Sequence, residues 1–223
     1  MSNARTGSPE AKVENWNVSQ GVDFSNMFRF STQERDLSSW NVSSGRYFSR
    51  MFAFVARPSV DVSRWDVSQG VDFSGMFRYA GFIGYTFNDD FSRWNVSSGT
   101  KLSEMFSSCS IFSSDLSNWD VSNGRDFSSM FENTKLFDSD LTSWNVSHGI
   151  AFDRMFAGAK AWNGDLSLWD VSSGESFAGM FAQGGYGAPH YNPALSKWDA
   201  VAETSPRCSV VYGISLGISR NGT

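Results

Sequence analysis

The sequence predicts an α/β solenoid in which every coil of about 25 residues contributes one short parallel strand and one short helix. Three observations support this fold class. A tryptophan recurs at near-constant spacing, a fixed pattern of Gly, Phe and Met-Phe follows it, and aromatic residues make up 16% of the 223 residues. Like residues that recur in register stack on one another, and such columns form the core of a solenoid.

The repeated unit reads Trp-Asn/Asp-Val-Ser-x-Gly-x-x-Phe-x-x-Met-Phe. Gly stands five residues and Met eleven residues after the tryptophan in seven coils, and a Phe follows each of these Met residues. A single coil is too small to bury its own apolar face, so neighbouring coils are expected to cover one another. The tryptophans of the unit are Trp16, Trp40, Trp65, Trp94, Trp119, Trp144, Trp169 and Trp198.

The first part of each coil is expected to be a strand. In one coil, Leu116, Trp119 and Val121 follow the Leu-x-x-Leu-x-Leu pattern of a leucine-rich repeat, with Trp in the second apolar position. Trp119 and Val121 alternate with Asp120, so the strand should point Trp and Val inward and Asp outward. Parallel pairing of these strands would join the coils.

A turn and a short helix are expected after the strand. Gly124 stands at a fixed place there, which indicates either a positive φ or a close approach of the main chain to a neighbour. Phe127, Met130 and Phe131 have the i, i+3, i+4 spacing of one helical face. The sequence therefore predicts a helix over 127–131 and over the equivalent residues of the other coils.

The repeat divides the chain into three parts: an N-terminal flank or cap over 1–12, the repeat solenoid over 13–200, and a C-terminal part over 201–223. Two coils carry four additional residues, and in both the insertion follows the predicted helix. Insertions confined to one loop are what a solenoid tolerates. Residues 212–218 alternate at period two, so the C-terminal part is either a closing cap strand or a disordered tail.

Charge and composition exclude several classes of protein. The formal net charge is −5, which gives no basic footprint for nucleic acid. The longest apolar-leaning stretch near an end, 208–219, is shorter than the roughly 20 residues of a spanning helix, so no membrane insertion is expected. The N-terminus lacks the apolar segment of a signal peptide, and no surface anchor is found. Cys109 and Cys208 are too far apart in sequence for a disulfide framework or a metal knuckle. The expected protein is a monomer without cofactor or metal.

The unit Asp-Leu-Ser-x-Trp-Asn/Asp-Val-Ser…Phe-Ser-x-Met-Phe closely resembles the BspA-like leucine-rich repeat surface proteins, whose repeats also occur in mycoplasma lipoproteins. The resemblance covers about residues 13–200. Two departures are Gly70-Val71, where family coils often carry Val-Thr, and Phe73, where many carry Met. The resemblance implies a repeat scaffold that binds partners, often in adhesion, at the cell surface or after secretion. It supplies no catalytic residues.

The sequence contains none of the familiar catalytic motifs, so no enzyme is expected. The chain has two histidines, and His148 stands where other coils carry Gln, Ser or Asn, which indicates an ordinary solvent position. His190 lies in the second insertion. No Gly-x-Ser-x-Gly, Cys–His pairing, phosphate loop or His-Glu-x-x-His occurs.

An aspartate stands four residues before most of the tryptophans and has two interpretations. A ladder of these carboxylates could hold Ca²⁺. Alternatively, each could cap a turn by accepting a main-chain N–H just before the strand, which is the interpretation that the following Leu-Ser favours. The residues are Asp36, Asp61, Asp90, Asp115, Asp140 and Asp165.

Two outward surfaces are candidates for binding. The first is the stripe of Asn or Asp that follows each tryptophan, which is either a polar binding face or a hydrogen-bonded ladder that closes the strand surface. The second is the inserted loops, whose Tyr85, Tyr186 and His190 either anchor a partner or fold back over the coil edge. The residues of the stripe are Asn41, Asp66, Asn95, Asp120, Asn145 and Asp170.

The sequence therefore predicts a non-catalytic repeat scaffold that binds proteins or glycans, with a role in cell-surface adhesion. The alternative is a structural spacer segment of a larger surface protein, with no ligand of its own. A binder should show a contiguous, non-repetitive surface patch, whereas a spacer should be uniform along the stack.

Overall fold

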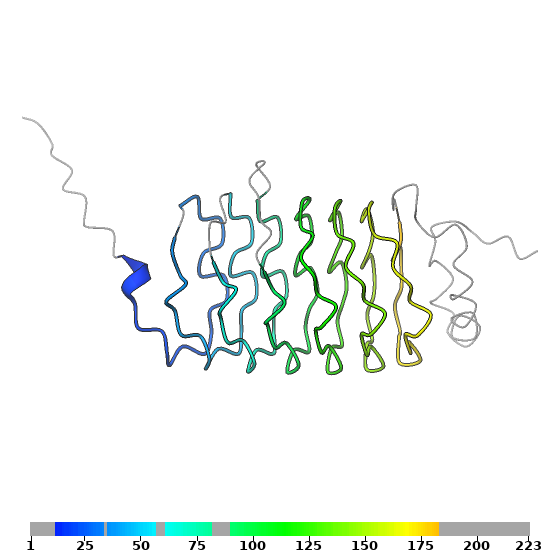
Figure 1. The fold of residues 1–223 in the computed structure, drawn as a ribbon, viewed down its shortest axis with the longest axis horizontal. Helices are drawn as coiled ribbons and strands as arrows, with labels where there is room; N and C mark the ends of the chain where they lie inside the picture. The colour runs from blue at the N-terminus through cyan, green and yellow to red at the C-terminus, as the bar shows by residue number, and fades with distance from the viewer. Residues whose placement is uncertain (1–11, 34, 57–60, 82–89, 183–223) are drawn as a thin grey trace, which may run out of the picture.

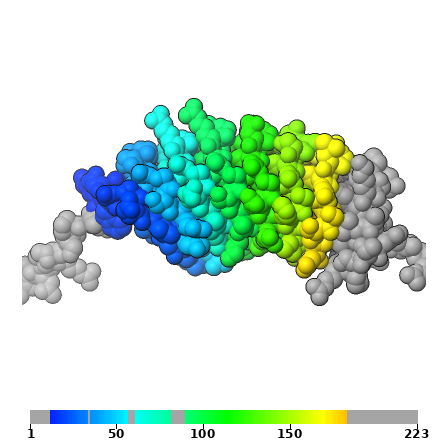
Figure 2. Space-filling view, turned by 90° about the horizontal axis from the view of Figure 1, so that it is seen from below, coloured from blue at the N-terminus to red at the C-terminus, as the bar shows by residue number. Residues whose placement is uncertain are grey.

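The computed structural model describes residues 12–33, 35–56, 61–81 and 90–182. Figure 1 shows this part of the chain winding as successive coils that lie side by side along the long axis. In the space-filling view the described coils form one continuous, elongated body (Figure 2). The expected C-terminal part over 201–223 and the last residues of the predicted solenoid lie outside the described residues.

Regular secondary structure is sparse in the described residues. One 3₁₀ helix, η1, spans Val13–Asn15. Six parallel β-bridges then join one residue of each coil to the equivalent residue of the next. The bridged residues stand two positions after the repeated Gly, and they form a single column: Asp23, Tyr47, Asp72, Lys101, Asp126, Ala151 and Ser176.

The inter-coil bridges differ in position from the predicted strand. Main-chain hydrogen bonds between described coils begin after the repeated Gly, and none joins the Trp-Asx-Val segments. Trp119 and Val121 nevertheless point inward, with exposed fractions of 3% and 1%, and Asp120 between them is exposed. In this segment side chains make the contacts between coils, so the expected alternation is present without a strand ladder.

The segment predicted as a helix is a run of turns. The Met130 N–H bonds the Phe127 carbonyl three residues back at 3.1 Å, whereas the Ser129 N–H donates to Asp153 of the next coil at 2.7 Å. Ser129 has a φ of 55°, which a right-handed helix does not allow. Because alternate N–H groups point to the next coil, the segment joins coils instead of closing an α-helix on itself.

This left-handed conformation recurs at two fixed positions in the coil, ten and fourteen residues after the tryptophan. A third residue with positive φ in a four-residue turn is the mark of a type II turn, which favours Gly or Asn. Most of these positions carry other residues. They are Asn26, Arg50, Gly75, Glu104, Ser129, Arg154 and Gly179, followed by Phe30, Phe54, Tyr79, Ser108, Asn133 and Gly158.

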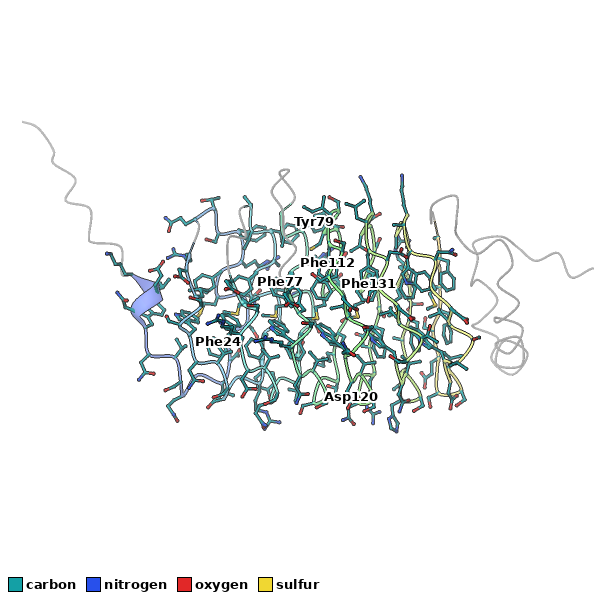
Figure 3. The ribbon with its side chains drawn as sticks, in the orientation of Figure 1. Phe24, Phe77, Tyr79, Phe112, Asp120 and Phe131 are labelled. Carbon is teal, nitrogen blue, oxygen red and sulfur yellow. The ribbon has the colours of Figure 1, made fainter. Side chains whose placement is uncertain are left out.

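The core consists of aromatic columns that run through the stack. Trp119 and Trp144 have ring centroids 6.4 Å apart with planes 1° from parallel, and Phe48 stacks on Phe73 at 5.5 Å. Figure 3 shows the labelled Phe24, Phe77, Phe112 and Phe131 inside the stack, between its two edges. The first coil is the exception, because its Trp16 is 48% exposed.

The repeated Gly is required by a close approach and not by a positive φ. A Cβ added to Gly124 would lie 2.3 Å from the Cζ atom of the Phe127 ring. Gly99 lacks this ring contact with its own coil because Leu102 replaces the phenylalanine there. Of the two explanations that the sequence left open, the structure supports the close approach.

Candidate interaction surface

The predicted polar stripe lies on the outside of the stack. Asn41, Asp66, Asn95, Asp120, Asn145 and Asp170 are all exposed. Figure 3 shows Asp120 at the edge opposite the one that carries Tyr79.

Each member of the stripe is engaged in a turn of its own. The Ser122 N–H donates to Asp120 Oδ1 at 3.0 Å, and the Ser43 N–H donates to Asn41 Oδ1 at 3.1 Å. The hydroxyl and the main-chain N–H of Ser122 lower the pKa of Asp120 from its ordinary value. The stripe is therefore a repeated series of Asx turns in which one side-chain oxygen of every residue is already used.

The aspartates four residues before the tryptophans also cap turns. The Ser117 N–H donates to Asp115 Oδ1 at 2.9 Å, and the Thr142 N–H donates to Asp140 Oδ1 at 2.9 Å. Within the described ranges, no group of three or more His, Cys, Asp or Glu side chains could hold a metal ion. The geometry agrees with the turn-capping interpretation.

His148 has a structural partner. Its Nδ1 lies 2.8 Å from the carbonyl oxygen of Ser122 in the preceding coil, so Nδ1 carries the proton in this contact. Ser44 makes the equivalent bond from its hydroxyl to the Ser19 carbonyl at 2.9 Å. In four coils this position therefore holds a side-chain donor that links neighbouring coils. The loop residues Tyr85, Tyr186 and His190 lie outside the described residues.

An exposed aromatic ladder interrupts the repeat at the second left-handed position. We call Phe30, Phe54 and Tyr79 the aromatic ladder. The centroids of Phe30 and Phe54 are 4.9 Å apart, and those of Phe54 and Tyr79 are also 4.9 Å apart. Phe30 is 59% exposed, and the other two side chains are half-buried. The next three coils carry Ser108, Asn133 and Gly158 at this position, so the ladder is confined to the first three coils.

Two arginines flank the ladder. The guanidinium carbon of Arg29 lies 4.7 Å from the centroid of Phe30 and 5.8 Å from that of Phe54. The guanidinium carbon of Arg78 lies 5.5 Å from the centroid of Tyr79. These are cation–π distances.

The fold does not require aromatic rings at the ladder position. The left-handed backbone recurs there at Ser108, Asn133 and Gly158, so it belongs to the coil and not to the ladder. A stacked aromatic pair contributes about 0.5–1.5 kcal/mol, and an exposed cation–π contact adds about 0.5–1 kcal/mol, while the rings remain in contact with water. Exposed apolar rings that the fold does not require are a candidate for function.

Sequence reasoning missed Phe30 and Phe54 because neither belongs to the repeated motif. The available signal was an aromatic residue at one position of three successive coils, followed by small or polar residues in the next three.

The described residues also form an open depression whose lining includes three aspartates. Its lining contains no histidine, cysteine or lysine, and thus none of the common nucleophiles or bases apart from hydroxyls and carboxylates. The depression is lined by Ser113, Asp115, Ser117, Leu136, Asp138, Ser139 and Asp140.

No helix in the described segments is long and apolar enough to cross a membrane.

The repeat places the chain in a known family. The family described as Mycoplasma protein of unknown function, DUF285, matches residues 1–84, 59–159 and 125–207, which together span most of the sequence. Neither the curated proteins nor the solved structures contain a match. Three overlapping matches along one chain agree with the recurrence of the tryptophan unit. The chain therefore belongs to the DUF285 family and is a repeat protein of that family.

Proposed function

We propose that this protein is a non-catalytic binding scaffold built as a leucine-rich-repeat-type solenoid. Stacked coils, a column of parallel β-bridges and the inward alternation of Trp119 and Val121 support the solenoid. A long stack of this kind offers an extended surface on which a protein or glycan partner can lie.

The aromatic ladder is the observation that carries the proposal. A spacer needs only a uniform exterior, and the polar stripe with its repeated Asx turns is uniform. The ladder departs from the repeat in three neighbouring coils and exposes apolar rings there. Phe and Tyr in such a patch are the residue types that anchor partners.

A cell-surface role in adhesion is proposed on the resemblance of the repeated unit to the BspA-like surface proteins. Membership of a Mycoplasma repeat family supports it, because the resembling repeats also occur in mycoplasma lipoproteins.

The spacer is the second candidate. Its support is the polar stripe, where hydrogen bonds such as Ser122 N–H to Asp120 Oδ1 satisfy polar groups locally and leave no distinctive feature from coil to coil. A protein that served only as a spacer would have no saturable partner.

The test compares two surface variants of the full chain. The first replaces the ladder by serine, Phe30→Ser, Phe54→Ser and Tyr79→Ser, because Ser108 shows that the position accepts serine. The second replaces Asn95, Asp120 and Asn145 of the polar stripe by alanine. We expect saturable binding of the native chain to at least one member of a panel of matrix proteins and glycans, with loss in one variant. No saturable binding across the panel would support the spacer instead.

A further inference from the structure

We propose that the aromatic ladder binds a short, extended peptide segment that carries both acidic and apolar side chains. The apolar side chains would lie against the rings of Phe30, Phe54 and Tyr79, and the carboxylates would face the arginines beside them. This inference rests on the proposed scaffold function and names the chemistry of its partner.

The orientation of the rings is the first argument. Phe30 and Phe54 stack with planes 25° from parallel, and Phe54 and Tyr79 stack with planes 10° from parallel. Because the rings cover one another's faces, the ladder presents mainly ring edges to a partner. Aromatic edges carry the positive part of the ring quadrupole, so they favour a partner with negative charge. A glycan ring that stacks flat would have far less ring face available.

The local charge is the second argument. The three turn segments that hold the ladder, 24–31, 48–55 and 73–80, contain the basic residues Arg29, Arg50 and Arg78 and no acidic residue. The equivalent segments of the next two coils contain Glu104 and Glu132 and no basic residue. A protein with a net charge of −5 thus has a locally basic patch at the ladder, which complements an acidic partner.

The ion pairing of these arginines is the third argument. Arg78 already donates to Glu104 Oε2 at 2.8 Å. Among the described residues, no carboxylate lies within ion-pair distance of Arg29 or Arg50, and both side chains are exposed. The Arg29 guanidinium is held beside the Phe30 ring, so part of the cost of ordering it is met before a partner arrives.

The length of the ladder sets the size of the partner. Two centroid steps of 4.9 Å each separate Phe30 from Tyr79. An extended peptide rises about 3.3 Å per residue, so about three or four residues cover the rings. The expected partner is therefore a short acidic and apolar motif within a longer chain.

Two fluorescein-labelled peptides test the charge requirement. One alternates Glu and Phe over eight residues, and the other replaces every Glu by Lys. We expect the Glu/Phe peptide to bind the full chain saturably in fluorescence anisotropy and the Lys/Phe peptide to bind at least tenfold more weakly. Equal binding of the two peptides, or no binding of the Glu/Phe peptide, would overturn the proposal.

Two variants of the chain test the location. The ladder variant Phe30→Ser, Phe54→Ser and Tyr79→Ser should weaken Glu/Phe binding at least tenfold, and Arg29→Gln with Arg50→Gln should weaken it at least threefold. The polar-stripe variant Asn95→Ala, Asp120→Ala and Asn145→Ala is the control and should bind as the native chain does. Circular dichroism and a thermal melt identify any variant that fails to fold, and the arginine pair, which is exposed, then carries the test.

Three other outcomes would also overturn the inference. A glycan or an oligonucleotide that binds the native chain and is lost in the ladder variant would assign the ladder to that ligand. Sedimentation that shows a self-associating chain, with dissociation in the ladder variant, would assign the ladder to a second copy. A matrix protein or glycan bound equally by the ladder variant would leave the scaffold function intact while removing the ladder from it.

Discussion

The indole Nε1 of Trp119 donates a 3.0 Å hydrogen bond to the main-chain carbonyl oxygen of Phe91 in the preceding coil. The same oxygen accepts the main-chain N–H of Trp94 at 3.0 Å. Both acceptor sites of this carbonyl are therefore used, one within its coil and one from the next coil. The relationship recurs from Trp40 to Trp169, so the tryptophan column is held by polar bonds as well as by ring stacking.

Replacing Trp119 by phenylalanine should destabilise the protein by about 2–4 kcal/mol, because the change removes a buried hydrogen bond and leaves a cavity. The neighbouring substitution Asp120→Ala should cost under about 1 kcal/mol, since its side chain is exposed and loses only a turn contact. Urea unfolding followed by circular dichroism measures both. Equal losses would show that inward and outward residues have been exchanged.

Gly124 and Gly99 differ in the atoms that an added methyl group would contact. Gly124→Ala should lower stability more than Gly99→Ala, because the added Cβ at Gly124 would lie 2.3 Å from the Phe127 ring. At Gly99 the nearest ring atom, from Phe73, is 3.4 Å away, although the Val96 carbonyl is close. Thermal midpoints of the two variants make the comparison. A larger loss at Gly99 would contradict the ring-contact explanation.

Replacing a residue that has a positive φ by glycine should stabilise the folded protein. Ser108 has a φ of 62°, so Ser108→Gly should relieve backbone strain and raise the unfolding free energy by up to about 1 kcal/mol after the added chain entropy of glycine. Ser128→Gly is the matched control and should be destabilising, because residue 128 does not adopt a positive φ. Chemical denaturation of both variants decides between strain relief and a general effect of glycine.

Acid should destabilise the stack. The hydroxyl and the main-chain N–H of Thr142 lower the pKa of Asp140 below its ordinary 3.8, and Ser38 lowers the pKa of Asp36 in the same way. A carboxylate whose pKa is lower in the folded state stabilises it above the unfolded pKa, and this contribution disappears as the pH falls through the folded pKa. The thermal midpoint should therefore change little from pH 7 to 5 and fall below about pH 4.

The variant Asp140→Asn is the control for this pH dependence. Asparagine already serves the same kind of turn at Asn41 and Asn145, so the fold should be retained while one titrating group is removed. The fall of the thermal midpoint in acid should be shallower in this variant. A midpoint that rises between pH 4 and 3 would contradict the turn-capping role of these carboxylates.

Much of the coil could be read from the sequence because its signal is periodic. The alternation of Trp119, Asp120 and Val121 gave the inward and outward phase that the burial shows. The prediction of a helix over 127–131 was wrong. Consecutive turns place Phe127, Met130 and Phe131 on the same side of the chain, as a helix would, so the spacing of apolar residues did not distinguish the two. A serine at position 129 does not indicate that its φ is positive. The glycines at the equivalent positions, Gly75 and Gly179, were the available signal for a left-handed backbone.

The candidate surface was harder to predict than the core. The aromatic ladder stands out only when residues are compared at a position that the motif leaves free, since Phe30 and Phe54 do not recur in later coils. The stacking of these side chains depends on two left-handed backbones that bring them into line, and side-chain chemistry alone does not encode that alignment.

The indole-to-carbonyl bond has a consequence for how such a protein can change in length. The motif tryptophans from Trp40 to Trp169 find their acceptors in the coil before them, so duplication or loss of a complete unit leaves these indole donors with a partner. A deletion of a few residues between two tryptophans would put the Nε1 of one out of line with its carbonyl. Duplication of whole units is thus the route of evolutionary growth that the hydrogen bonding of the interior permits.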